Sequence, residues 1–246
     1  MSQFRETFAN RHVILPVIHV AEPEQALRNA EIARRQECDG VFLIRHEIDY
    51  TELLRIHHLL YEAFPDWWVG INCLDLNPSE VFGVITDEVA GVWVDNAMID
   101  ERESQQVKAE EIQAARARSN WQGLYFGGVA FKYQRHVEDI ARAARLAAEY
   151  MDVVTTSGPA TGESADRDKI QTMKEALGDF PLAVASGTTP ENIGGYLDTA
   201  DSFLVATGIS KSWLEFDEER VRDYVTRIRA YQGPGQAEQE TPHAAS

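Results

Sequence analysis

Short apolar runs alternate with longer amphipathic segments along most of the chain. The runs are rich in β-branched and aromatic residues and are apolar on both faces, as buried strands of a parallel sheet should be. The segments between several of them repeat apolar positions every three or four residues, which indicates helices. The expected strands are Val13–His19, Val41–Arg45, Trp68–Asn72, Gly91–Asp95, Leu124–Phe131, Asp152–Thr156, Leu182–Ser186 and Phe203–Thr207.

Helix-start signals support this alternation. Asn77–Glu80 combines a capping side chain, a proline at the first helical position and an acidic residue in the first turn. Thr189–Glu191 has the same features and predicts the start of the seventh helix. The clearest helical periodicities cover Glu24–Arg35, Thr51–Phe64, Val107–Arg118 and Val137–Tyr150.

Eight strands that alternate with helices predict an α/β protein with a single (β/α)₈ TIM barrel over residues 1–231. An open, doubly wound sheet is the structural alternative. The first ten residues are expected to form a small plug or helix. Residues 232–246 are polar and rich in Gly, Pro and Gln, which predicts a disordered C-terminal tail.

Charge and composition narrow the class of partner. The chain has 40 acidic and 23 basic residues and a formal charge of −17, so nucleic acid and anionic membrane surfaces should repel it. No apolar run approaches the roughly 20 residues of a membrane span, and the N-terminus lacks the apolar core of a secretory signal. Cys38 and Cys73 form no CxxC pair. We therefore expect a cytoplasmic protein without nucleic-acid or integral membrane partners; the sequence leaves homo-oligomerisation open.

Candidate catalytic residues follow from the barrel, because such folds carry their active sites at the C-terminal ends of the strands. His19 and Asp95 end two strands and are acid/base candidates. Lys132 ends a hydrophobic run and can neutralise a phosphate or carboxylate, or form a Schiff base. The alternatives are a turn cap for Asp95, a solvated rim charge for Lys132, and a divalent metal held by His19, His46 and Asp95. We expect neither a cofactor nor a metal.

The endings of strands six to eight predict a phosphate site. Glycines allow backbone N–H groups to approach an anion closely, and the start of a helix adds partial positive charge. The alternatives are tight turns at Gly187 and Gly208, and a pairing of Arg45 with Glu47 or with an aspartate of a neighbouring strand. The expected substrate- or phosphate-binding residues are Arg45, Ser157, Gly158, Thr161, Gly162, Ser186, Gly187, Thr207 and Gly208.

Two stretches in the second half of the chain resemble the BtpA family. The first is DVVTTSGPATGESAD at 152–166, and the second is ASGTTPENI at 185–193, followed by FLVATG at 203–208. The resemblance implies a barrel similar in fold to the ribulose-phosphate-binding barrels. It also implies a ligand rim, which would comprise Gly158, Thr161, Gly162, Ser186, Gly187 and Gly208.

The resemblance carries no settled reaction. The family's founding association is with photosystem I biogenesis, and other members occur in sugar or nucleoside contexts. This chain departs from the family pattern after strand eight, where Ile209–Trp213 replaces a lysine and a glycine-containing loop. The phosphate loops also resemble those of phosphoribosylanthranilate isomerase. That enzyme has a cysteine after strand one and an aspartate after strand six, where this chain has His19 and Thr156, so its activity is not expected.

These observations predict an enzyme that acts on a small phosphorylated sugar or nucleotide-derived metabolite. An isomerase, a lyase and a hydrolase all fit the candidate residues. The competing hypothesis is a barrel that kept the anion site without the chemistry and serves in assembly, biogenesis or ligand sensing.

Overall fold

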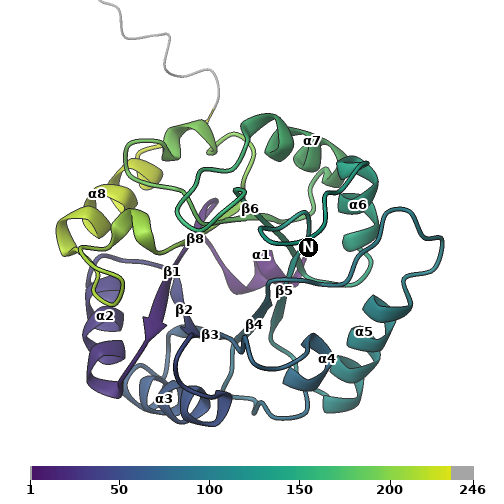
Figure 1. Cartoon of the computed structure of the whole chain (residues 1–246). Helices are drawn as coiled ribbons and strands as arrows, with labels where there is room; N and C mark the ends of the chain where they lie inside the picture. The colour runs from purple at the N-terminus through teal and green to yellow at the C-terminus, as the bar shows by residue number, and fades with distance from the viewer. Residues whose placement is uncertain (1, 234–246) are drawn as a thin grey trace, which may run out of the picture.

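Strand β1 (Val13–Val20) is hydrogen-bonded to β2 (Gly40–Arg45) on one side and to β8 (Ser202–Val205) on the other. This pairing of the first and last strands closes the sheet, and Leu15 lies opposite Leu204 across the closure. The computed structural model describes residues 2–233. Within them, eight parallel strands follow one another in chain order around the barrel, and helices ring the strands (Figure 1). The prediction of a (β/α)₈ barrel is confirmed, and the open sheet is excluded.

The remaining elements complete the alternation of strands and helices. The other strands are β3 (Trp68–Asn72), β4 (Gly91–Val94), β5 (Leu124–Gly128), β6 (Val153–Ser157) and β7 (Leu182–Ala185). The helices are α1 (Gln3–Thr7), α2 (Pro23–Arg35), α3 (Tyr50–Ala63), α4 (Pro78–Val81), α5 (Val107–Ser119), α6 (Ile140–Ala147), α7 (Arg167–Leu177) and α8 (Glu218–Arg229). Two 3₁₀ turns, η1 (Ile193–Gly195) and η2 (Thr207–Ile209), follow β7 and β8. Of the tail predicted at 232–246, residues 234–246 lie outside the described residues.

The N-terminal segment lies at the end of the barrel where the strands begin, as expected for a plug. Phe4 is fully buried, with its ring 6.4 Å from that of Phe126 on β5. Phe8 packs against Trp68 at 5.5 Å between ring centroids. Figure 1 shows α1 crossing behind the ring of strands. The end of the barrel where the strands begin is therefore closed by aromatic side chains.

Two expected elements differ from the structure. Strand β5 ends at Gly128 instead of Phe131, because Ala130 has a positive φ of 48° and turns the chain out of the sheet. The helix expected after Thr189 is only the 3₁₀ turn η1, because the glycine pair at 194–195 lowers helix propensity. Thr189 Oγ1 nevertheless accepts the backbone N–H of Glu191, as a capping residue does.

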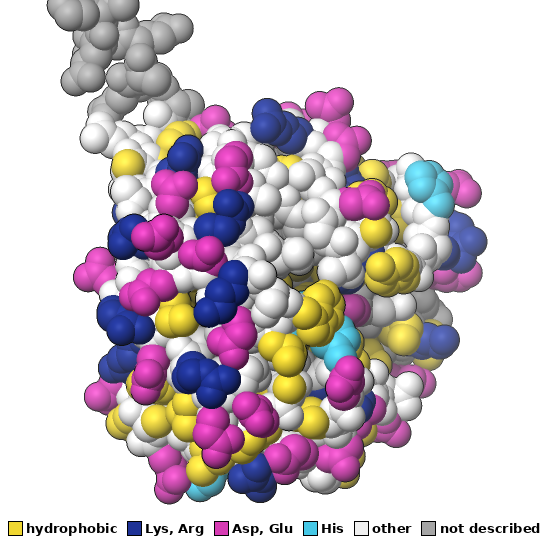
Figure 2. All heavy atoms as spheres, turned by 60° about the vertical axis from the view of Figure 1, so that its left-hand side comes forward, with side chains coloured by type: hydrophobic (Ala, Val, Ile, Leu, Met, Phe, Trp, Pro, Cys, Tyr) yellow, Lys and Arg dark blue, Asp and Glu magenta, His cyan; other side chains and the backbone are white. Residues whose placement is uncertain are grey.

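Charges of both signs are interspersed over the face formed by α2 and α8 (Figure 2). Arg28 and Glu215 pair at 2.9 Å there, and Arg35 pairs with Glu218 at 3.0 Å. The pattern on this face is one of local pairs instead of a basic stripe. Across residues 2–233, none of the helices combines the length and the apolar character that a bilayer crossing requires.

Candidate active site

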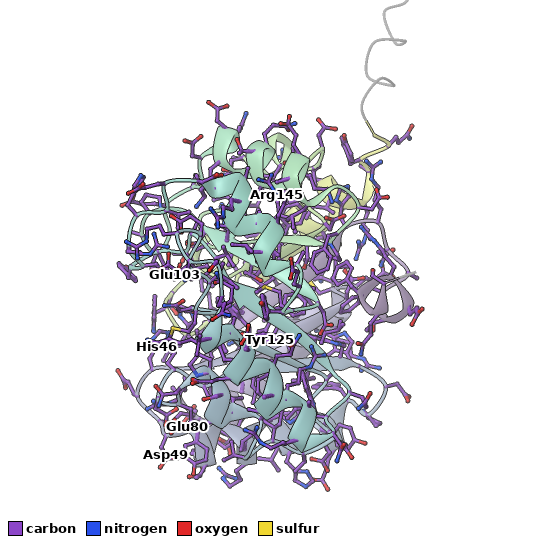
Figure 3. All side chains as sticks on the ribbon, turned by 90° about the vertical axis from the view of Figure 1, so that its right-hand side faces the viewer. His46, Asp49, Glu80, Glu103, Tyr125 and Arg145 are labelled. Carbon is purple, nitrogen blue, oxygen red and sulfur yellow. The ribbon has the colours of Figure 1, made fainter. Side chains whose placement is uncertain are left out.

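The polar residues of the barrel mouth continue the inward-facing rows of the strands. Side chains alternate along a strand, so the row that contains Val17 on β1 continues two residues later with His19. Trp93 on β4 belongs to the barrel interior, and the next residue of its row is Asp95. His46 extends the row of β2 in the same way, and Figure 3 shows it at this end of the barrel. The alternation that fills the core thus also aims these groups into the mouth.

A cavity of about 250 Å³ lies at this mouth. Its floor is apolar and includes Val17, Ile44, Trp93 and Leu204, which separate it from the packed interior. All three expected catalytic residues meet in it, together with three hydroxyl residues from the expected phosphate loops. These six residues are His19, Asp95, Lys132, Thr161, Ser186 and Thr207.

Asp95 is held by a buried neighbour. Asn72, which is 2% exposed at the end of β3, donates its side-chain amide to Asp95 Oδ1 at 2.9 Å. Burial raises the pKa of the Asp95 carboxyl, while the Asn72 hydrogen bond and the charges of Lys132 and His46 act in the opposite direction. A carboxylate with a raised pKa in a cavity is a stronger base than one in water.

His19 is a neutral imidazole at physiological pH. Burial, reinforced by the positive charge of Lys132 and of His46 when protonated, lowers the pKa of His19 to about 4. Its Nδ1 is buried and has no hydrogen-bond partner among the described residues, and the same holds for Trp93 Nε1. Other buried side-chain atoms of the described residues also lack partners, namely His12 Nε2, Tyr125 Oη, Thr155 Oγ1 and Ser202 Oγ, so this feature is not confined to the cavity.

Lys132 joins the loops that follow β5 and β6. Its Nζ donates to Thr161 Oγ1 at 3.1 Å, and its backbone N–H donates to Ser157 Oγ at 2.8 Å. Ser157 is fully buried and in turn donates to the carbonyl of Gly158. Ser157 therefore braces the backbone below the lysine instead of lining the cavity.

The expected phosphate-binding glycines lie where loops press against one another. A Cβ at Gly187 or at Gly158 would lie 2.0 or 2.1 Å from the carbonyl oxygen of Glu163. A Cβ at Gly208 would lie 2.0 Å from that of Thr188. These glycines permit close packing of the loops after β6, β7 and β8, which sets the positions of the hydroxyl residues. A direct contact of Gly158, Gly187 or Gly208 with phosphate stays a prediction.

Positive φ angles gather on the same rim. Gly162 has a φ of 81°, and Ser186 has a φ of 72° at the end of β7, where few residues other than glycine occur. The Ser186 hydroxyl donates to the carbonyl of Ala160 at 3.2 Å, which ties β7 to the long loop after β6. Strained residues of this kind concentrate at functional sites.

Arg45 does not line the cavity. Its guanidinium pairs with Asp75 at 3.3 Å and also donates to the carbonyl of Ile48. Asp75 follows β3, the strand next to β2, so the alternative of a partner from a neighbouring strand is the one observed. A phosphate contact from Arg45 would require this ion pair to open.

Three apolar residues at the mouth are absent from the sequence-based set. Trp213 lies 3.8 Å from His19 and 5.3 Å from His46, measured between ring centroids. Leu74 and Tyr133 line the same cavity from the loops after β3 and β5. Their signal in the sequence is an apolar side chain inside a polar loop directly after a strand, which is hard to distinguish from ordinary surface exposure.

The next question is whether the side chains of the described residues could hold a metal ion with three ligands. Between residues 2 and 233, no cluster of at least three His, Cys, Asp or Glu side chains has the geometry to hold an ion. His19 and His46 instead pack ring against ring, with centroids 5.0 Å apart.

The fold and this cavity define a (β/α)₈ barrel with its candidate site at the C-terminal ends of the strands. The sequence model of the BtpA family matches residues 70–230, and the chain belongs to the BtpA family. It is similar to the uncharacterized protein TK2179 of Thermococcus kodakarensis, with 33% identity over 124 residues. That match spans 50% of this chain and 45% of the relative, about half of each.

Solved structures of low sequence identity share the fold. (S)-3-O-geranylgeranylglyceryl phosphate synthase from Thermoplasma acidophilum, in complex with its substrate sn-glycerol-1-phosphate, has a TM-score of 0.67 at 17% identity, covering 94% of this chain and 100% of that one. Tryptophan synthase subunit alpha from Legionella pneumophila has the same TM-score and coverage at 14% identity. Phosphoribosyl anthranilate isomerase from Thermus thermophilus has a TM-score of 0.61 at 15% identity, covering 88% and 98%.

Proposed function

We propose that the protein is an enzyme that acts on a small phosphorylated sugar or nucleotide-derived metabolite in the cavity at the barrel mouth. The observation that carries this proposal is the convergence of His19, Asp95 and Lys132 on one cavity at the C-terminal ends of the strands. Titratable groups that meet in one cavity at this end of a barrel, one of them a carboxyl with a raised pKa, are typical of an active site.

In this proposal the phosphate of the substrate lies against the loops after β6, β7 and β8. Thr161 and Thr207 line the cavity with side-chain hydroxyls, and Thr207 begins the η2 turn two residues after the end of β8. Lys132 adds positive charge from the neighbouring loop. Support comes from the synthase of similar fold, which was solved with a phosphorylated substrate. Loops seven and eight are the common phosphate site of such barrels.

Asp95 is the general base in this scheme. Its raised pKa strengthens it as a proton acceptor, and Asn72 keeps the carboxylate oriented. Lys132 stabilises negative charge that develops on a substrate oxygen as the proton leaves. His19, a neutral imidazole that lines the cavity, donates or accepts a hydrogen bond with the substrate. Proton abstraction beside an oxygen that gains charge fits an isomerase or a lyase, and activation of water by Asp95 fits a hydrolase.

Thermal unfolding against a panel of phosphorylated sugars and nucleotides tests the site. At least one compound should raise the melting midpoint of the wild type. Lys132→Met should lose that rise, whereas Lys108→Met, a change at an exposed lysine on α5, should keep it. If no compound shifts the wild type, the proposal fails.

Turnover of the compound that binds is then followed by ³¹P NMR. Asp95→Asn should retain binding and lose turnover by about 10²–10⁴-fold, the usual contribution of a general base. Binding without turnover in the wild type would favour the ligand-sensing or assembly alternative over catalysis.

A further inference from the structure

The mouth of the barrel has two unlike halves. Over β6 to β8 it presents the hydroxyls of the expected phosphate loops. Over β1 to β5 it presents two aromatic side chains and one leucine, which we call the aromatic arc: Trp213, Leu74 and Tyr133. Trp213 belongs to the loop after β8 but packs over the ends of β1 and β2. These three side chains are 51%, 40% and 79% exposed, and few other large hydrophobic side chains are as exposed in the described part of the chain. Their clustering at one cavity is therefore a feature of the site.

Trp213 is placed to contact a ligand on its open face. One side of the indole packs on His19 and His46, and about half of the side chain remains exposed. It also lines a second hollow of about 280 Å³, which shares His19 and Thr207 with the central cavity. The indole thus stands at the border of two adjoining spaces, where a ligand that fills one extends past it into the other.

Tyr133 faces the mouth from the opposite side. Strand β5 lies four places from β1 in the eight-stranded ring, so the loop that carries Tyr133 stands across the mouth from His19. Tyr133 has a positive φ of 63°, an outlier for a bulky residue. This conformation costs free energy and leaves the ring exposed, which is the pattern of a residue held for binding.

The size of the cavity indicates what the arc is for. Pockets that enclose a small-molecule ligand usually measure about 300–1,000 Å³. The central cavity, at about 250 Å³, is below that range and accommodates a phosphorylated sugar fragment better than a larger molecule. A further group attached to that fragment would rest on the rim, where the aromatic arc offers flat apolar surface.

We propose that the aromatic arc binds a heteroaromatic ring, so that the ligand is a nucleotide-like compound in which the ring is joined to a phosphorylated sugar. This inference rests on the proposed function and narrows its substrate class. The ring stacks on the exposed face of Trp213, while the sugar phosphate reaches Lys132 and the hydroxyls of Thr161 and Thr207.

Calorimetric titration with the four nucleoside 5′-monophosphates and with ribose 5-phosphate tests the inference. At least one mononucleotide should bind the wild type about tenfold or more tightly than ribose 5-phosphate does. Trp213→Ala should weaken that mononucleotide by about 5- to 150-fold, the range for loss of a base stack. It should leave ribose 5-phosphate within about twofold. Trp213→Phe should restore part of the affinity.

The matched control is Tyr61→Ala, because Tyr61 is a 36% exposed aromatic residue on α3 that does not line the mouth. This variant should bind every probe as the wild type does. Equal affinity for ribose 5-phosphate and all four mononucleotides would overturn the ring site and leave the phosphate site standing. If neither ribose 5-phosphate nor any of the four mononucleotides binds, the ring site is overturned, whereas the proposed function fails only if no compound of the wider panel binds.

Discussion

Asn72 and Asp95 are joined by a hydrogen bond of 2.9 Å across the ends of β3 and β4. The bond opposes the effect of burial on the Asp95 pKa, so its removal should raise that pKa further. We expect the acid limb of the pH–rate profile of Asn72→Leu to move to higher pH, with the plateau rate reduced less than in Asp95→Asn. An unchanged acid limb would exclude Asp95 as the group that titrates in that limb.

The buried carboxylate of Asp95 should also destabilise the folded protein. Its pKa is higher in the folded chain than in the unfolded one, so wild-type stability falls as pH rises from about 3.8 through the folded pKa. Asp95→Asn removes this penalty and should raise Tm at pH 7 by a few degrees, for a gain of about 0.5–2 kcal/mol. Calorimetry at pH 7 and pH 3.5 is the check, since the gain should vanish where the wild-type carboxyl is protonated. A variant that melts lower than wild type at pH 7 would contradict it.

Gly187 should be intolerant of any side chain. Gly187→Ala adds a Cβ about 2.0 Å from the Glu163 carbonyl oxygen at a residue with a φ of 73°. We expect a loss of about 2–4 kcal/mol in urea denaturation, from strain and displaced backbone together.

Gly194→Ala is the matched control for that change, because nothing lies within 4 Å of its Cβ position. It should be neutral or stabilise by up to about 1 kcal/mol. Similar losses at Gly187 and Gly194 would mean that the loops after β6 and β7 are not in contact.

Glu101 should stabilise the folded chain above acidic pH. It is 2% exposed, pairs with Arg135 and accepts the backbone N–H of Glu138 at 2.9 Å, and these partners lower its pKa to about 2. The stabilisation is complete above the unfolded pKa near 4.5 and is lost as pH falls through 2. Because Arg135 is about one third exposed, we expect Glu101→Gln to cost about 1–3 kcal/mol at pH 7.

Denaturation of Glu101→Gln at pH 7 and pH 3 measures this contribution, and the deficit should shrink at the lower pH. Glu52→Gln is the control, since Glu52 forms an exposed ion pair with Arg55 on α3 and should change stability by less than about 0.5 kcal/mol. Equal effects of the two substitutions would show that the Glu101 pair is no stronger than a surface pair.

The barrel and part of its mouth were predictable because they depend on the alternation of strands and helices along the chain. Each strand is a short apolar run between helical segments, and the residues that end these runs, such as His19 and Asp95, are expected at the C-terminal end of the barrel. The end of β5 was not predictable in this way. The run 129–131 is as apolar as a strand, and only the positive φ of Ala130 turns it out of the sheet.

The rest of the site depends on contacts between distant loops. Gly208 has the same appearance in the sequence whether it approaches a phosphate or, as here, the carbonyl of Thr188. Arg45 pairs with Asp75, which lies 30 residues away in the numbering and next to it in the barrel. Trp213 comes from the loop after β8 and reaches the histidines at the ends of β1 and β2, a contact that no local pattern encodes.

The aromatic plug formed by Phe4 and Phe8 has a kinetic consequence. Because these side chains close the base of the barrel, substrate enters and product leaves through the same mouth. The product must therefore leave the cavity before the next substrate binds. A ligand group that is bound on the rim then also slows the release of product. Slow release, instead of the chemical step, would accordingly limit the turnover of compounds that stack well on Trp213.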